Sequence, residues 1–158
     1  MKIELVKALA KMEYIGKMKM ENDGSFSMNY MNGIQSPHGY FRSMGDIVYF
    51  MIVKGRLMKI GKAGGINGWY GRFSMYGKGL LKGGDRTNKR IHAKMLELKR
   101  KGIDIFVLPV KRKTVKTKCN LTDKLLRVHV PMNGEIEDHL FHTFKNEPLL
   151  FCQQKGGI

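Results

Sequence analysis

The fold of this chain is decided by the stretch Asp46-Ile47-Val48-Tyr49-Phe50-Met51-Ile52-Val53-Lys54-Gly55-Arg56-Leu57-Met58-Lys59-Ile60-Gly61. Its first half is a run of apolar and β-branched residues, and residues 57–61 form a shorter, mostly apolar run. Between the two runs lies Lys54-Gly55-Arg56, with glycine at its centre. Two such runs joined by a short glycine-containing turn predict a β-hairpin.

The residues after the hairpin alternate between helix and strand patterns. A glycine-rich connection over 62–68 precedes them, and Thr87 and Gly102 are a typical N-cap and C-terminal glycine for one of the helices. The expected elements are a short helix over 69–76, a helix over 88–101, a strand over 103–110, a short strand over 125–130 and a helix over 134–146. This order predicts a small α/β sandwich.

The N-terminal 45 residues are less regular. Residues 1–19 carry apolar side chains at spacings of three and four, which favours a short amphipathic helix or arm. Residues 21–45 are rich in Gly, Asn and Ser and read as a loop, with a short hairpin as the alternative. We therefore expect an N-terminal arm over 1–45 and a main body over 46–158, within one compact domain.

Composition excludes several classes of protein. The 158 residues include 29 Lys and Arg against 13 Asp and Glu, a formal net charge of +16. No apolar run of about 18 residues is present, so no membrane span and no signal peptide are expected, and the predicted location is cytoplasmic. Cys119 and Cys152 are too few for a disulfide framework or a four-cysteine zinc site.

The charge is concentrated in the second part of the chain. Residues 1–45 carry six bases and four acids, a net of +2, and residues 46–158 carry 23 bases and nine acids, a net of +14. A highly soluble surface is the simple interpretation, but a large field of one sign attracts polyanions. DNA or RNA is therefore the favoured partner.

One carboxylate of the helix over 134–146 falls on the apolar face. At about 100° per residue, Ile136, Leu140, Phe141 and Phe144 define that face, and Glu137 lies in its middle. A carboxylate there needs a cation or hydrogen-bond donors. A structural ion pair with Lys or Arg and a site for a hard divalent cation such as Mg²⁺ remain equal alternatives on the angles alone.

The polar face of the same helix offers a competing metal site. Glu135, His139 and His142 follow at i, i+4 and i+7, a spacing that could bind Zn²⁺. Two ordinary surface histidines are the more common explanation, because no further Cys or His cluster supports a site.

The ordered set of residues resembles the GIY-YIG nuclease family. Ile47-Val48-Tyr49, then Lys59-Ile60-Gly61, Arg72, a basic helix, a third strand, Glu137 and Asn146 follow the order of that family's motifs over about residues 46–146. The resemblance implies a sandwich with a central, mainly antiparallel sheet of three strands flanked by helices, a nuclease domain over 46–158 and a basic insertion over 111–118.

The chain departs from the usual motifs of the family in two places. Ile47 and Val48 replace the usual Gly and Ile, and Lys59 replaces the second motif tyrosine. Lys at that position resembles the small type II restriction endonucleases of the family, and the compact layout also resembles the phage endonuclease II enzymes. Tyr14-Ile15-Gly16 spells the second motif literally but lacks the preceding strand, so we interpret it as chance.

The resemblance implies a role for each matching residue. Tyr49 would orient or deprotonate the attacking water, and Lys59 would favour its phenolate form or hold the water or the scissile phosphate. Arg72 would bind a non-bridging phosphate oxygen through its planar guanidinium group. Glu137 would hold one Mg²⁺ ion, with Mn²⁺ as the alternative. His92, at the border of its helix's apolar stripe, is a further candidate, with a core-edge histidine as the alternative.

Double-stranded DNA is the partner that the resemblance implies. The residues expected to contact it are Lys62, Arg86, Lys89, Arg90, Lys111, Arg112 and Lys113. Such contacts position a duplex without reading its sequence. Base reading is assigned to the segment 21–45, with Asn29, Asn32, Gln35 and Arg42, or to the segment 111–118.

These observations converge on one hypothesis with two alternatives. The hypothesis is a Mg²⁺-dependent DNA endonuclease of bacterial or phage origin, a type II restriction enzyme acting as a homodimer on a palindromic site. The alternatives are a phage or mobile-element nuclease of loose specificity and a non-catalytic basic nucleic-acid-binding protein.

Overall fold

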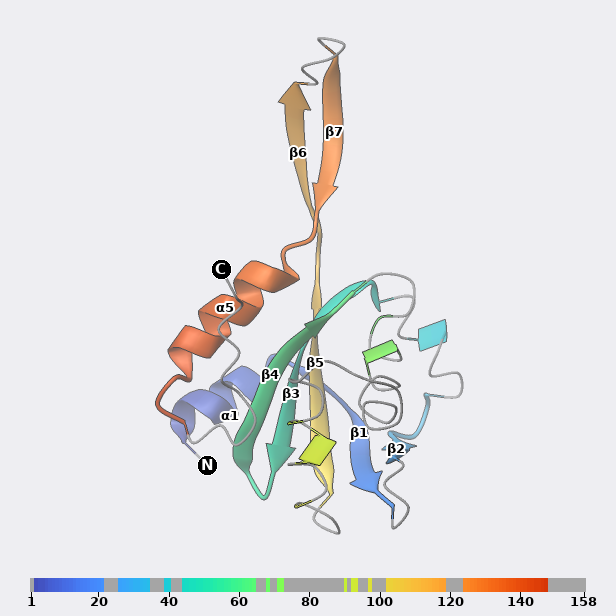
Figure 1. Ribbon diagram of the computed structural model, residues 1–158, viewed down its shortest axis with the longest axis vertical. Coiled ribbons are helices and arrows are strands. Elements are labelled where there is room, and N and C mark those ends of the chain that lie inside the picture. Colours follow the sequence, from blue (N-terminus) through green and yellow to red (C-terminus); the bar gives the residue numbers. More distant parts are fainter. Residues whose placement is uncertain are drawn as a thin grey trace.

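The computed structural model describes residues 2–21, 26–34, 39–40, 44–64, 68, 71–72, 90, 92–93, 97, 102–118 and 124–147. Its elements in chain order (Figure 1) are α1 (Ile3–Leu9), β1 (Glu13–Met20), β2 (Phe26–Tyr30), β3 (Asp46–Val53), β4 (Arg56–Ala63), β5 (Ile103–Val110), β6 (Lys113–Lys118), β7 (Leu125–Val130) and α5 (Asn133–Thr143).

The predicted hairpin forms one side of the main sheet. β3 and β4 pair antiparallel, and their turn is closed by the pair Val53 and Arg56. Lys54 and Gly55 both have positive φ, 48° and 71°, as a two-residue turn that follows the twist of the strands requires. The sheet has five strands in the order β2-β1-β5-β3-β4, so β4 lies at an edge.

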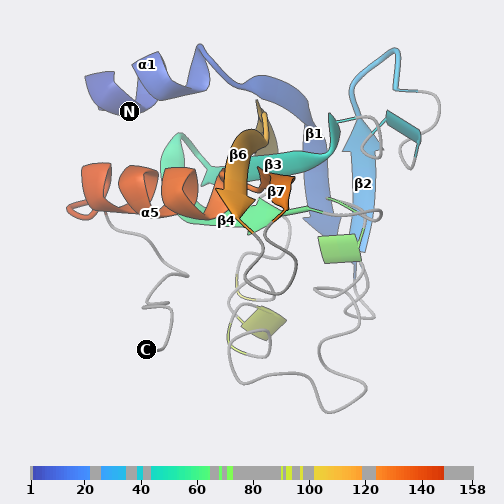
Figure 2. The same cartoon turned by 90° about the horizontal axis from the view of Figure 1, so that it is seen from above.

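Both faces of β3 are buried, which its unbroken apolar run anticipated. We call the face that carries Tyr49 and Met51 the first face and the face that carries Val48, Phe50 and Ile52 the second face. Leu5 of α1 and Phe144, which caps α5, join the core of the second face. Phe144 meets Phe50 edge to face, with ring centroids 5.7 Å apart. Figure 2 shows α1 and α5 toward the β3 and β4 side of the molecule and β2 on the opposite side.

The predicted sheet of three strands corresponds to β5, β3 and β4, but the sheet extends further. The segment expected as an arm supplies β1 and β2, and β1 pairs with β5. A register shift between Tyr14 and Gly16 marks a bulge in β1. Because the bulge adds one residue, the two fully buried side chains Ile15 and Met18 fall three positions apart, a spacing that imitates a helix.

The basic segment 111–118 was expected as a loop and is largely a strand. β6 pairs antiparallel with β7 in a separate two-stranded sheet. Every described side chain of the pair is exposed except half-buried Val130. Because neither face of β6 is buried, its sequence has no alternation of apolar and polar residues from which the strand could have been predicted.

The remaining sequence expectations agree with the structure where it describes them. The strands over 103–110 and 125–130 and the helix over 134–146 match β5, β7 and α5. The helices expected over 69–76 and 88–101 lie mostly outside the described residues, but Arg72, Arg90, His92, Ala93 and Glu97 are helical. No helix within the described ranges is long and apolar enough to cross a membrane.

Candidate functional site

Tyr49 and Gly61 form the centre of the candidate site. They lie directly opposite each other in the β3–β4 pair, and Tyr49 is 1% exposed. A Cβ placed on Gly61 would lie 2.4 Å from the Tyr49 hydroxyl oxygen and 2.4 Å from Cζ. The tyrosine ring therefore covers Gly61, and the third residue of Lys59-Ile60-Gly61 is glycine because any side chain would displace the hydroxyl.

Lys59 lies on the same face two residues before Gly61. It is opposite Met51, and directly opposed residues of an antiparallel pair point to one side of the sheet. Its side chain is buried, with 4% of the residue exposed. Tyr49 and Lys59 are thus diagonal neighbours, a separation that long side chains can bridge. The register therefore puts the buried side chains of Lys59 and Tyr49 on the same face of two adjacent strands.

Glu137 lies against the second face and forms an ion pair. Its Oε2 is 3.4 Å from Nζ of Lys62, which is opposite the second-face residue Val48. The Glu137 side chain is 24% exposed, and that of Lys62 is 48% exposed. Of the two alternatives left by the helix angles, the ion pair is present, and the carboxylate still reaches solvent.

The predicted catalytic set therefore divides between the two faces of the sheet. Of the predicted catalytic residues, Tyr49 and Lys59 lie on the first face and Glu137 lies against the second, where its partner is Lys62, a predicted DNA contact. The groups approach each other at the C-terminal end of β4, because Gly61 and Lys62 are consecutive residues of this edge strand.

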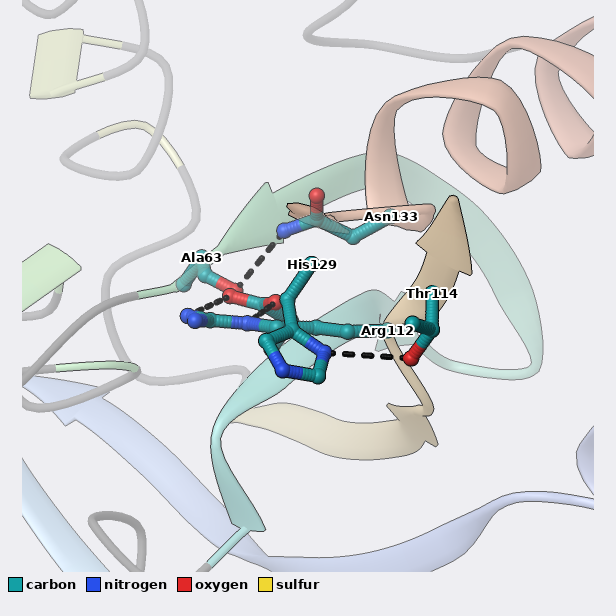
Figure 3. A network of polar contacts seen from close by, with 6 residues as sticks. Ala63, Arg112, Thr114, His129 and Asn133 are labelled. Atoms are coloured by element: carbon teal, nitrogen blue, oxygen red, sulfur yellow. Dashed lines mark hydrogen bonds and ion pairs between the residues drawn. The ribbon is translucent and has the colours of Figure 1, made fainter. Parts of the chain in front are cut away.

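A polar network adjoins this end of β4 (Figure 3). The guanidinium group of Arg112 donates from Nε to Oδ2 of Asp46 at 2.7 Å and from Nη2 to Oδ1 at 3.4 Å. Asp46 is 4% exposed, and its contact with Arg112 raises the pKa of the guanidinium group. Asn133, the first residue of α5, donates from Nδ2 to the carbonyl oxygen of Ala63 at 3.1 Å. The network ties β3, β4, the start of β6 and the start of α5 together.

Sequence reasoning missed the roles of Asp46, Asn133 and Gly64. A Cβ on Gly64 would lie 2.3 Å from Oδ1 of Asp46, so this glycine makes room for the buried carboxylate. A lone acid directly before an apolar strand was the signal available in the sequence. Arg112, expected as a DNA contact, holds this acid, while its side chain remains 50% exposed.

The other predicted residues have separate positions. Arg72 is half-buried and helical, Arg90 is exposed and helical, and His92 is fully buried. Lys111 and Lys113 are exposed beside the start of β6, and Asn146 is exposed after α5. Arg86, Lys89, Gln35 and Arg42 lie outside the described residues, whereas Asn29 is in β2 and Asn32 is in the turn that follows it.

The structure does not support the competing metal site on α5. Glu135, His139 and His142 are all exposed. Among the residues that can be described, no three His, Cys, Asp or Glu side chains come together as metal ligands. Mg²⁺ needs less from the protein, because one or two carboxylates suffice beside water and substrate phosphate. Glu137, half-buried and accessible, fits that requirement as a single carboxylate ligand.

Tyr14-Ile15-Gly16, interpreted from the sequence as a chance match, lies in β1 and has a structural role there. Gly16 has φ 144°, and a Cβ there would lie 2.2 Å from the carbonyl oxygen of Asn29. The Tyr14 hydroxyl donates to Oδ1 of Asp104 at 3.2 Å. Burial, and then the Asp104 charge, raise the pKa of Tyr14 above its ordinary value. This tyrosine joins β1 to β5 and is neutral at physiological pH.

Comparison with known proteins gives structural neighbours. Neither a protein-family model nor a curated protein sequence matches the chain. A mutant of bacteriophage T4 EndoII superimposes with a TM-score of 0.57 at 13% identity, over 92% of this chain and 95% of that one. The restriction endonuclease HPY188I in complex with product DNA superimposes with a TM-score of 0.59 at 14% identity, over 98% of this chain and 87% of that one. The mixed α/β fold inferred from the sequence is thus the fold of two solved endonucleases.

Proposed function

We propose that this chain is a Mg²⁺-dependent endonuclease that hydrolyses phosphodiester bonds in double-stranded DNA, and that it is a restriction enzyme of the GIY-YIG type. The observation that carries the proposal is that the buried Tyr49 of β3 covers Gly61 of β4. Lys59, two residues before Gly61 on β4, is buried on the same face. The likeness of the whole fold to two endonucleases and the net charge of +16 support the same function.

The reaction needs a nucleophile, charge neutralisation and a stabilised leaving group. Tyr49 would accept a proton from the attacking water, or orient it, while Lys59 stabilises negative charge on the phenol oxygen or on the phosphate. Arg72 would bind a non-bridging oxygen of the scissile phosphate. Glu137 would hold Mg²⁺, or Mn²⁺ in its place, and a bound ion of this kind supplies charge neutralisation at the phosphate and leaving oxygen.

The division of the site between two faces suggests where the substrate lies. A DNA strand along the edge of β4 would reach the second-face pair Glu137 and Lys62, whose side chains are 24% and 48% exposed. Tyr49 and Lys59 are 1% and 4% exposed, so the first face would have to be uncovered as the strand binds. The Lys62 ammonium group, 3.4 Å from Glu137, would then exchange that carboxylate for a DNA phosphate as the ion binds. His92, buried in its helical segment, would act only by positioning its neighbours.

Matched pairs of variants test the proposal. Tyr49→Phe keeps the ring over Gly61 and removes the hydroxyl, so cleavage of plasmid DNA in Mg²⁺ should fall by about 10²-fold or more. Tyr14→Phe removes the hydroxyl of a tyrosine in β1, outside the candidate site, and should leave cleavage within about twofold. Glu137→Gln should abolish cleavage, whereas Glu135→Gln, an exposed position on the same helix, should not.

Two results would contradict the proposal. One is purified protein that cuts no duplex in Mg²⁺ or Mn²⁺ while it still binds DNA, which would favour the non-catalytic module. The other is equal cleavage by Tyr49→Phe and Tyr14→Phe. The chain's mass in solution tests the homodimer that a palindromic site calls for.

A nuclease of loose specificity is the second candidate, and the likeness to the phage T4 protein favours it. Sequencing the ends of the plasmid fragments separates the two candidates. A restriction enzyme should give discrete bands with one end sequence, whereas the alternative should give many unrelated ends.

A further inference from the structure

The two-stranded sheet of β6 and β7, here called the ribbon, projects beyond the five-stranded sheet (Figure 1). It leaves the body directly after β5 and returns directly into α5. Apart from half-buried Val130, all of its described side chains are exposed. A two-stranded ribbon without a covering layer is only marginally stable by itself.

The two faces of the ribbon differ in chemistry. Pairs on one face are Lys116 with Arg127 and Thr114 with His129, and Lys118 lies on this face as well. Leu125, opposite Lys118, is the apolar residue of this face. The other face carries Val115, Leu126, Val128 and Val130, with Lys113 and Thr117 beside them. We call the first of these the cationic face. Residues 111–118 and 124–130 contain seven Lys and Arg and no Asp or Glu.

The pair at the middle of the cationic face is unfavourable within the ribbon. Lys116 and Arg127 lie directly opposite each other, and like charges at opposed positions of a strand pair destabilise it. The acid-free sequence of the ribbon offers this pair no compensation from within. A polyanion laid against the face would remove the repulsion and neutralise both groups.

The base of the ribbon is fixed to the candidate site. Arg112, immediately before β6, is held by buried Asp46 of β3. Asn133, three residues after β7, is held by Ala63 at the end of β4. Thr114 Oγ1 and His129 Nδ1, 3.2 Å apart, join the two strands just above this base (Figure 3). A duplex gripped by the ribbon would therefore be held at a set position relative to the edge of β4.

We propose that the cationic face of the ribbon enters the major groove of duplex DNA, with Lys116 and Arg127 at the base edges and neighbouring lysines on the phosphates. The major groove, about 12 Å wide, admits a two-stranded ribbon, and Arg and Lys are the side chains that most often contact guanine O6 and N7. The proposal rests on the duplex substrate of the proposed function, but it concerns binding and is independent of cleavage.

The first test compares two double variants in DNA binding without divalent metal. Lys116→Ala with Arg127→Ala removes two charges from the ribbon. Lys54→Asn with Arg56→Ala removes two charges from the exposed β3–β4 turn. This turn lies at the far end of the eight-residue strand β3, about 23 Å from Asp46 at the base of the ribbon. Asn suits the positive φ of Lys54. In about 0.1 M NaCl the ribbon variant should bind a mixed-sequence duplex at least about tenfold more weakly, and the turn variant within about twofold.

The same variants are titrated across about 50 to 200 mM NaCl. Removing one lysine or arginine from a phosphate reduces the slope of log K against log salt by about 0.9. Because Lys116 and Arg127 are assigned to base edges, the ribbon variant should lose affinity and discrimination between duplexes, with a slope change of less than about 1.8. Equal binding by the ribbon and turn variants overturns the proposal, whether or not the wild-type protein cleaves DNA.

A second measurement uses the unchanged protein, so it does not depend on a variant folding. Acetylation of exposed lysines with and without duplex should show protection of Lys116 and Lys118, which share the cationic face, but not of Lys54. A duplex methylated at guanine N7 should compete less well than untreated duplex, and equal competition overturns the major-groove assignment. A change of solution mass in Leu126→Thr with Val128→Thr, with DNA affinity unaltered, would instead make the ribbon an interface between two copies of the chain.

Discussion

Two glycines of this sheet make close contacts that serve different purposes. Gly61 accommodates the ring of Tyr49 from the neighbouring strand. Gly16 adopts a backbone conformation with φ 144° and approaches the carbonyl oxygen of Asn29. The first glycine leaves room for a candidate catalytic hydroxyl, whereas the second allows a bulge in β1. At the scale of single residues, function depends on which atom lies above the missing side chain.

Gly61→Ala tests the first of these contacts. The new methyl group would lie 2.4 Å from the Tyr49 ring in a fully packed core, so the ring or the strand must move. We expect a loss of about 1–3 kcal/mol in the free energy of unfolding and a large loss of cleavage. Urea denaturation and the plasmid assay measure the two effects.

Gly134→Ala is the matched control for this substitution. Its nearest contact is the flexible end of Lys62, with Nζ at 3.1 Å, and Ala is the better helix former within α5. The stability of this variant should be unchanged or raised. Equal destabilisation by the two substitutions would show that Tyr49 does not depend on the space above Gly61.

The residues of the candidate site were predictable to different degrees. Tyr49 and Lys59 could be predicted, because a strongly apolar strand pair fixes the register that puts them on one face. The helix angles predicted that Glu137 lies on the apolar face of α5. They could not predict its partner Lys62, because they do not say which strand lies opposite the helix. Asp46 and Arg112 are 66 residues apart, and no local pattern links them.

At the scale of elements, Tyr14 joins β1 to β5 through a bond that depends on pH. Its hydroxyl donates to Asp104, and its ring packs on Phe106 with centroids 5.1 Å apart. The pKa of Tyr14 is raised by burial first and then by Asp104. A group whose pKa is higher in the folded state stabilises the fold below its ordinary pKa of 10.0 and loses that contribution as pH rises through the folded value.

Tyr14→Phe should therefore change the alkaline limb of the stability curve. Near pH 8 the variant should lose about 1 kcal/mol or less, because one half-buried hydrogen bond is removed while the ring stays. Above about pH 10 the wild-type protein should lose stability faster than the variant, since ionised Tyr14 is repelled by Asp104. Urea denaturation at both pH values measures this, and parallel curves would contradict it.

The ion pair between Asp46 of β3 and Arg112, just before β6, is buried on one side only. The Asp46 side chain is 3% exposed, whereas that of Arg112 is 50% exposed. Loss of Arg112 leaves a buried carboxylate without its donor, but loss of the Asp46 charge leaves a cation that water can solvate. The order of the two effects is therefore fixed by burial.

Asp46→Asn should cost about 1 kcal/mol in the free energy of unfolding, since an amide oxygen still accepts from Arg112. Arg112→Ala should cost more than Asp46→Asn, and it should cost much less when Asn already occupies position 46. Chemical denaturation of the two single variants and the double variant gives the coupling. Additive effects would show that the pair does not hold the ribbon to β3.

The elements that sequence reasoning placed wrongly share a physical cause. In β1 a bulge shifts the buried side chains Ile15 and Met18 out of period two, and in the ribbon no burial exists to create a period. β3 was found from an unbroken apolar run that is buried on both faces, and β5 and α5 from the apolar side chains that they turn toward the core. β7 was found although its side chains are exposed, because it is rich in Leu and Val. A periodic pattern therefore reports burial, and an exposed strand is found only where its composition favours one.

At the scale of the whole molecule, the charge acts on folding and on binding in opposite directions. A net charge of +16 repels itself in the folded state, and added salt screens that repulsion. The same salt weakens any complex with DNA, because the release of counterions from DNA contributes less favourable free energy when the salt concentration in solution is high. The two effects can be separated by measuring stability and affinity in one salt series.

We therefore expect the melting temperature of the protein alone to rise by several degrees as NaCl increases from about 50 to about 500 mM, while DNA affinity falls steeply over the same range. Chloride is the right anion, since phosphate and sulfate would bind the cationic sites directly. Short duplex DNA should raise the melting temperature at low salt and lose this effect at high salt. In the Lys116→Ala with Arg127→Ala variant the stabilisation by NaCl should be smaller, because two opposed charges of the ribbon have already been removed. Two results would contradict this expectation: a melting temperature of the protein alone that falls with NaCl, or a duplex that raises the melting temperature equally at both salt concentrations. Either result would mean that the excess positive charge does not control both the stability of the chain and its binding to DNA.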